Sequence, residues 1–174
     1  MDLGLKGASA VVQGGTQGMG LAAAECFAED GARVAVMART KSDLDATVER
    51  LEKLGSPEAI GLQADITDRE QVDAAFRAVG ERWAQLNILV NAAGPAGIGG
   101  IEDLTDDEWI DSFDIGAMGM VRCVRAALPL LRAAEWARIV NVSAHSTKRQ
   151  TATLADQAYQ LVLGPQHHVR AVPG

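Results

Sequence analysis

The chain has 174 residues, of which 48% are hydrophobic and 22% are charged, and this size and composition are typical of one globular domain. The net charge of -7 argues against a nucleic-acid partner, because phosphate backbones are bound by clustered Lys and Arg and the sequence contains no such cluster. The N-terminus lacks the basic region and apolar core of a signal peptide, and no stretch has the length of a membrane span. We therefore expect a cytoplasmic protein without a membrane partner.

The first predicted element is a buried strand over residues 10–13, followed by a glycine-rich turn over residues 14–20 that opens a helix. Gly14 permits a tight turn, Gly18 leaves the backbone bare where a pyrophosphate would lie, and Gly20 lets the helix pack closely on its strand. Because a helix N-terminus also attracts anions, the pattern favours a phosphate-binding turn. The apolar spacing predicts an inward helical stripe formed by Met19, Ala22, Ala23, Cys26 and Phe27.

Both cysteines, Cys26 and Cys123, fall on apolar helical stripes. A small buried hydrophobic side chain is the ordinary role of a cysteine in such a position. The sequence therefore predicts two buried thiols without a redox or metal function, which fits a reducing compartment.

Strands and helices then alternate along the chain. Further buried strands are predicted over residues 33–37, 59–62, 86–90 and 138–142. Thr40 begins the second helix and Gly55 ends it, with Leu44, Val48 and Leu51 on its inward face. Capping boxes at residues 67–70 and 105–108 begin two more helices, and the last of these is long and is expected to bend or break near Pro129. This alternation requires a parallel sheet with helices on both faces.

Four motifs stand at the ends of predicted strands. They are the glycine turn at residues 14–20, Asp65-Ile66, Asn91-Ala92-Ala93-Gly94 and Ile139-Val140-Asn141-Val142-Ser143. With these motifs, residues 5–150 resemble the short-chain dehydrogenase/reductase family. The resemblance implies an α/β fold, a Rossmann-type doubly wound parallel sheet with helices on both faces, that lacks the last strands. It divides the chain into a dinucleotide-binding domain over residues 1–150 and a divergent or truncated segment over residues 151–174.

The resemblance implies that a dinucleotide lies across the strand ends. Asp65 would bind the adenine and residues 91–94 would line the floor beneath the cofactor, while Asn91 could also simply tie its loop to the strand predicted over residues 86–90. An acidic side chain after the second strand would favour NAD, but here Ala38 precedes Arg39, whose guanidinium suits a 2'-phosphate. NADP is therefore favoured, with NAD as the alternative. The predicted cofactor-binding residues are Gly14, Thr16, Gln17, Gly18, Met19, Gly20, Arg39, Asp65, Ile66, Asn91, Ala92, Ala93 and Gly94.

In this family a tyrosine exchanges a proton with the substrate oxygen, and a lysine four residues later lowers the tyrosine pKa. A serine binds the substrate, and an asparagine on the long helix supports a water relay. Tyr159 is the only tyrosine and lies where the family has one, but Leu163 occupies the lysine position and Gly116 the asparagine position. A phenol has a pKa of about 10, which a nearby ammonium lowers and a leucine does not. The catalytic candidates are Tyr159 with Ser143 or Ser146.

The residues after Tyr159 continue no pattern of this family, so a truncation or a reading-frame shift of a longer reductase is one hypothesis. The adjacent His167 and His168 point apart and have no carboxylate or cysteine nearby, so an exposed tail is expected there rather than a metal site.

Three functions stay open at this point. The first is an oxidoreductase that transfers a hydride between NADP(H) and a small carbonyl or secondary-alcohol substrate. The second is a catalytically impaired remnant that binds dinucleotide without turnover, and the third is an inert fragment with an unpaired strand edge. The resemblance also implies a homo-oligomer formed through the long helix at residues 105–131.

Overall fold

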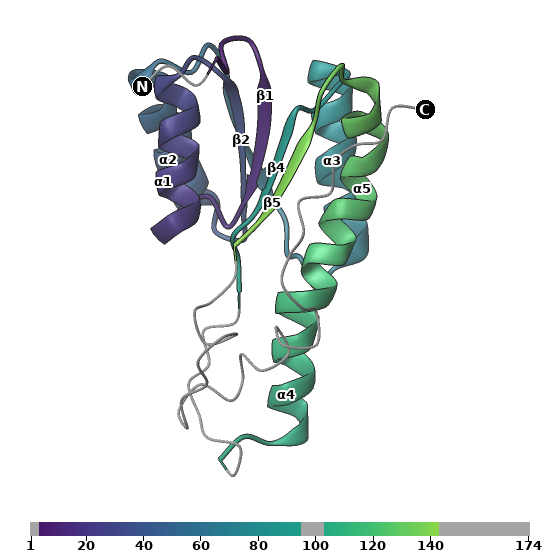
Figure 1. The fold of residues 1–174 in the computed structure, drawn as a ribbon. Helices are drawn as coiled ribbons and strands as arrows, with labels where there is room; N and C mark the ends of the chain where they lie inside the picture. Colours follow the sequence, from purple (N-terminus) through teal and green to yellow (C-terminus); the bar gives the residue numbers. More distant parts are fainter. Residues whose placement is uncertain (1–3, 95–102, 143–174) are drawn as a thin grey trace.

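The computed structural model describes residues 4–94 and 103–142. Within these ranges five strands form one parallel sheet in the order β3-β2-β1-β4-β5 (Figure 1). The strands are β1 (Ser9–Gln13), β2 (Arg33–Ala38), β3 (Ala59–Gln63), β4 (Ile88–Asn91) and β5 (Arg138–Asn141). The helices are α1 (Gly18–Glu29), α2 (Lys41–Leu54), α3 (Arg69–Trp83), α4 (Asp106–Phe113) and α5 (Gly119–Ala133), with the π-helical segment η1 (Asp114–Met118) between the last two. The predicted doubly wound parallel fold is confirmed.

Helices cover both faces of the sheet, with α1 and α2 on one face and α3 and α5 on the other (Figure 1). Successive residues of β1 therefore pack into different layers. Val11 belongs to the same buried cluster as Phe76 of α3, and Val12 belongs to the same cluster as Leu51 of α2. A strand covered on both sides needs apolar residues at consecutive positions, which is why β1 carries an unbroken apolar run.

The predicted inward face of α1 is wrong for most of its residues. The helix buries Gly20, Ala24 and Ala28, whereas Met19 is 67% exposed and Cys26 is also exposed. Small residues at a spacing of four let this helix lie close to the sheet. Of the predicted face, Phe27 packs against a buried cluster, where it is partly buried. The prediction of two buried cysteines therefore fails for Cys26 and is confirmed for Cys123 alone.

Two helix N-termini test the predicted capping boxes. At α4 the box is confirmed, because the Thr105 side chain accepts from the Glu108 amide and the Glu108 carboxylate accepts from the Thr105 amide. At α3 the N-cap is Asp68, whose carboxylate accepts hydrogen bonds from two amides of the first turn. Thr67 is instead bonded to Asp65, so the helix begins one residue later than its box predicts.

The long helix predicted over residues 105–131 is present, but its departure from α-helical bonding lies at η1. The Gly119 amide donates to the Asp114 carbonyl, five residues back, as in a π-helix. Pro129 lies inside α5, which continues to Ala133. The predicted break near Pro129 is therefore replaced by an irregular turn one third of the way along the helix.

The chain changes its direction of winding at β1, which lies between β2 and β4. Gln13, the last residue of β1, is in register with Met37 of β2 and with Asn91 of β4. In open parallel sheets, ligands bind outside the carboxyl ends of the strands at such a point. The turns that follow β1 and β4 therefore form the candidate ligand site.

Candidate functional site

The turn between β1 and α1 leaves no room for side chains at two of its glycines. Gly14 has a φ of +75°, and a Cβ there would lie 2.7 Å from the Ala93 nitrogen. A Cβ at Gly20 would collide with the Gly14 carbonyl oxygen. At Gly18, by contrast, a Cβ would meet nothing within 4 Å. The turn is thus packed hard against the β4 turn on one side and is open at its tip.

Gln13 connects the two turns and was missed by the sequence analysis. Its side chain is 2% exposed, and its Oε1 accepts hydrogen bonds from the amides of Ala92 (3.1 Å) and Ala93 (2.9 Å). The Ala92 amide also donates to the Gln13 backbone carbonyl at 3.0 Å, so the side chain adds a second acceptor there and supplies the acceptor for Ala93. A buried amide in this place helps to hold the turn, since its loss would leave the Ala93 donor unpaired. A polar residue directly after the apolar run of β1 was the signal that could have found it.

Asn91 supports the sheet next to this turn. Its side chain is 2% exposed, and its Nδ2 donates to Oδ1 of Asn141 at 2.8 Å, while its backbone carbonyl accepts from the Val142 amide. These contacts join β4 to β5 at their carboxyl ends. The predicted alternative was a tie between the loop and β4, whereas the Asn91 side chain joins β4 to the neighbouring strand β5. This bond does not conflict with a place in the cofactor floor.

Asp65 follows β3 at the same edge of the sheet. Its Oδ1 accepts from the Thr67 amide at 2.9 Å and from the Thr67 hydroxyl at 2.8 Å. These hydrogen bonds, led by the backbone one and aided by the positive charge of Arg39, hold the pKa of Asp65 below its ordinary value despite partial burial. Asp65 is therefore an anion at neutral pH, and the buried side chain of Ile66 anchors the turn beneath it.

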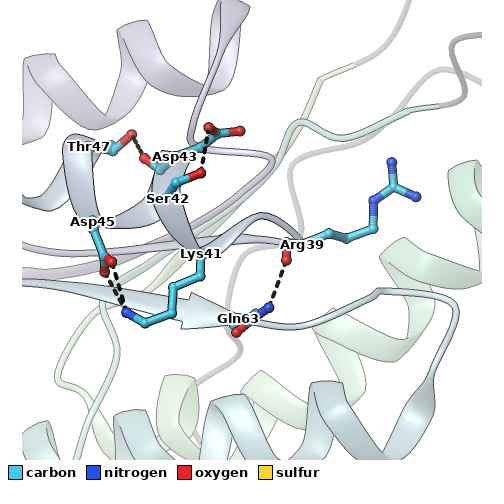
Figure 2. A network of polar contacts seen from close by, with 7 residues as sticks. All are labelled: Arg39, Lys41, Ser42, Asp43, Asp45, Thr47 and Gln63. Carbon is cyan, nitrogen blue, oxygen red and sulfur yellow. Dashed lines mark hydrogen bonds and ion pairs between the residues drawn. The ribbon is translucent and has the colours of Figure 1, made fainter.

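Arg39 follows β2 and is exposed. Figure 2 shows its guanidinium directed away from the polar network around it, in which the Arg39 carbonyl accepts from Gln63 Nε2 at 3.0 Å. Lys41, two residues further, is paired with Asp45 at 2.8 Å. Among the described residues of this network, Arg39 is thus the cation whose charged group has no side-chain partner.

The structure brings most of the predicted cofactor residues to one edge of the sheet. Gly14 and Gly20 lie against the Ala92–Ala93 turn. Thr16 lies in the bend before α1, Gln17 is the N-cap residue of this helix, and Gly18 and Met19 are its first two residues. Gly94 is exposed at the end of the β4 turn.

The predicted catalytic residues Ser143, Ser146 and Tyr159 lie outside the described residues, as do Leu163, His167 and His168. Gly116, at the asparagine position, is buried in η1. Within residues 4–94 and 103–142, no group of three or more His, Cys, Asp or Glu side chains is placed to hold a metal ion.

Comparison with known proteins gives one consistent family. The model of the short chain dehydrogenase family matches residues 8–158. A ketoacyl reductase assigned to the monensin polyketide synthase of Streptomyces virginiae is 39% identical over 142 residues, which are 80% of this chain and 54% of that protein. The crystal structure of L-sorbose reductase from Gluconobacter frateurii with NADPH and L-sorbose is 29% identical, with a TM-score of 0.86 over 94% of this chain and 62% of that one. NAD+-bound xylitol dehydrogenase, at 22% identity, shares the fold with a TM-score of 0.84 over 89% of this chain and 60% of that one.

The chain spans about half the length of the curated relatives it matches, 54% and 57% for two of them. In the part of the chain that the structure describes, no helix has both the length and the apolar character that crossing a bilayer demands. The parallel sheet, the glycine turn and the family match agree, and this chain belongs to the short-chain dehydrogenase family of oxidoreductases.

Proposed function

We propose that residues 1–150 bind NADP(H) across the carboxyl ends of β1 and β4, as the cofactor domain of an oxidoreductase. The reaction is a hydride transfer between NADP(H) and a carbonyl or secondary-alcohol substrate. The observation that carries the proposal is the glycine turn, which is tightly packed at Gly14 and Gly20 and open at Gly18. A diphosphate fits there, because bare backbone and the N-terminus of the 12-residue helix α1 face the same place.

The position of Arg39 supports NADP over NAD. No acidic residue follows β2 before Asp43, so nothing at the strand end would bind ribose hydroxyls as a carboxylate does. The guanidinium of Arg39 forms no hydrogen bond or close ion pair with the described residues, although its charge acts on Asp65. It suits a 2'-phosphate, since a planar fork of donors binds phosphate in two places. The relative crystallised with NADPH, L-sorbose reductase, is consistent with this choice.

Reduction of a carbonyl is the direction that we propose. L-sorbose reductase and the Streptomyces ketoacyl reductase are both named as reductases, although a relative from Sinomonas cyclohexanicum is named as a dehydrogenase. We extend that chemistry to this chain, with Tyr159 as the proton donor and Ser143 or Ser146 as the group that binds the substrate oxygen.

Dinucleotide binding without turnover is the second candidate. Two replaced residues favour binding without turnover. Leu163 occupies the expected lysine position, and Gly116 occupies the expected asparagine position. A leucine cannot supply the ammonium by which a lysine at position 163 would lower a tyrosine pKa. Absorbance of NADPH with a panel of small ketones separates the candidates, since turnover consumes NADPH and binding alone does not.

A matched pair of variants at Gly18 tests cofactor binding. Asparagine and aspartate both tolerate the positive φ of +54° at this position, and neither side chain would meet a neighbour at Cβ. Gly18→Asp differs from Gly18→Asn only by a negative charge placed where the diphosphate would lie. In calorimetric titrations with NADPH we expect Gly18→Asp to bind at least about tenfold more weakly than Gly18→Asn. Absence of NADPH and NADH binding by the wild type would overturn the proposed function.

We also propose self-association through the long helix. Its α4 and α5 segments expose the apolar side chains of Ile110 (64%), Phe113 (41%) and Val121 (38%). Single exposed apolar residues are common on protein surfaces, but three such residues on consecutive helical segments favour a contact with another protein chain. Light scattering after size-exclusion chromatography measures the molar mass, and we expect a dimer or larger oligomer for the wild type and a smaller species for Ile110→Asp. A wild type with the mass of a monomer, equal to that of Ile110→Asp, would contradict the proposal.

A further inference from the structure

The guanidinium of Arg122 bridges two parts of the chain that are far apart in sequence. Its Nη2 donates to Oδ1 of Asp114 at 2.6 Å, and its Nη1 donates to the Ile66 carbonyl at 3.2 Å. The Arg122 side chain is only 16% exposed and that of Asp114 is 32% exposed. A charge pair in such a half-buried place is screened less than one on the open surface. Arg122 therefore forms a specific link between η1 and the turn after β3.

The link spans the irregular part of the long helix. Asp114 is the first residue of the π-helical turn and Arg122 lies eight residues further, in the first turn of α5, with its Nη1 also 3.4 Å from the Asp114 carbonyl. That carbonyl already accepts the π-type bond from the Gly119 amide. π-helical turns are rare and frequently occur at functional sites. Arg122 thus stabilises this turn with its side chain while it holds Ile66.

A second contact fixes Ile66 against the same helix. A Cβ at Gly119 would lie 2.8 Å from Ile66 Cδ1, so only glycine lets α5 approach this side chain so closely. The Ile66 side chain and the Ile66 carbonyl are therefore both held, the first by Gly119 and the second by Arg122. The turn that carries Asp65 is built on this support.

The contacts of Ile66 with Gly119 and Arg122 also fix the position of the preceding residue, Asp65. In the described part of the chain, hydrogen bonds from Thr67 reach its Oδ1, and the Asp65 amide donates to Gln71 Oε1 at 3.0 Å. No donor among the described residues is bonded to Oδ2, so this oxygen is available to a bound ligand. At the end of β3, two strands away from the glycine turn, this oxygen lies at the adenosine end of the proposed site.

We propose that Arg122 is a positioning residue for the dinucleotide, holding the Asp65–Ile66 turn against η1 so that Asp65 meets the adenosine end. This inference rests on the proposed function, because it concerns the same site. In this proposal the long helix contributes to cofactor binding through Arg122, and that contribution does not require an asparagine at position 116.

Arg122→Met tests the inference in the whole chain, because methionine keeps the apolar stem and removes the guanidinium. Arg125→Met is the matched control, since Arg125 is an exposed arginine one turn further along α5. At a temperature well below each unfolding transition, we expect Arg122→Met to bind both NADPH and adenosine 2',5'-bisphosphate about tenfold more weakly, the effect of one charge-assisted hydrogen bond. Arg125→Met should bind like the wild type, and Arg122→Lys, with one donor group, should fall between.

Hydrogen exchange at the Thr67 amide gives a measurement without ligand. We expect faster exchange at Thr67 in Arg122→Met and in Asp114→Asn, but not in Arg125→Met, with amides of β1 unchanged in all three variants. A variant that is less stable overall, with unaltered affinity for the bisphosphate and unaltered Thr67 exchange, would show a merely structural role and overturn the inference. Faster exchange with unchanged affinity would overturn it as well.

The failure of the proposed function gives a different result. If the wild type binds neither NADPH nor the bisphosphate, cofactor binding is disproved and the positioning role falls with it, whatever Thr67 does. If the wild type binds both and Arg122→Met binds equally well, the proposed function stands and only the role of Arg122 is lost.

Discussion

The side-chain oxygen of Gln13 lies 2.9 Å from the Ala93 amide nitrogen, and this contact joins residues 80 positions apart in the chain. It fixes the turn after β4 to the end of β1, with the glycine turn on its other side. Two segments that line the proposed site are thereby held in one arrangement before any ligand binds. Such preorganisation reduces the entropy that binding must otherwise lose.

Gln13→Leu should therefore destabilise the fold and weaken cofactor binding together. Leucine fills a similar volume but leaves the Ala93 amide without its acceptor, which costs about 1–3 kcal/mol for a buried donor, whereas the Ala92 amide keeps the Gln13 backbone carbonyl. Urea unfolding measures the free energy of unfolding, and calorimetry measures NADPH affinity. Gln85→Leu is the control, because Gln85 is half-buried at the other end of the sheet. Equal effects of the two substitutions would contradict the role of Gln13.

Arg39→Gln should lower the affinity for NADPH by about tenfold and leave the affinity for NADH unchanged, because only NADPH carries the 2'-phosphate. The measurement is a pair of titrations with the two nucleotides. Lys53→Gln removes one positive charge elsewhere, where Lys53 pairs with Glu49 on α2, so it controls for net charge. An equal loss for NADH would show that Arg39 does not read the phosphate.

Glu58 should make the stability of the protein fall in acid. The Arg82 guanidinium beside it, and the Trp83 Nε1 that donates to it at 2.7 Å, lower the pKa of this carboxyl below its ordinary value. A lowered pKa in the folded state gives stability that is complete above the unfolded-state pKa, about 4.3, and is lost as pH falls through the folded-state value.

The difference in unfolding free energy between the wild type and Glu58→Gln should therefore be largest at neutral pH and shrink below about pH 4. Glu81→Gln, at an exposed glutamate of α3, should show no such pH dependence. Urea unfolding at a series of pH values measures both. A difference that stays constant down to the lowest pH would refute the assignment.

The two cysteines should react at very different rates with a thiol reagent. Cys26 is exposed, whereas burial raises the pKa of the Cys123 thiol to about 12, so Cys123 offers almost no thiolate at neutral pH. Under native conditions we expect one modified thiol, identified as Cys26 by peptide mass spectrometry, and a second only in denaturant. Cys26→Ser should abolish the native reaction. Rapid native modification of Cys123 would contradict its burial.

Local sequence signals predicted the order of strands and helices and the position of the glycine turn between β1 and α1 correctly. The consecutive apolar residues of β1 predict a strand covered on both faces, and Gly14 predicts a tight turn after it. Both signals depend only on a few neighbouring residues. The capping box of Thr105 and Glu108 was predicted for the same reason. These features need no information from distant parts of the chain.

The tertiary structure decided what depends on distant partners. The inward face of α1 follows from how closely Gly20 and Ala24 approach the sheet, and apolar spacing alone favoured Met19 and Cys26. Gln13 meets Ala93, and Arg122 meets the Ile66 carbonyl 56 residues away, only because parallel strands bring their carboxyl ends to one edge. The sequence by itself determined the order of strands and helices and the bare glycine turn, since these depend on backbone freedom and local burial. Which polar side chains support that turn was decided by folding, because a hydrogen bond between distant residues exists only once the sheet has placed them together.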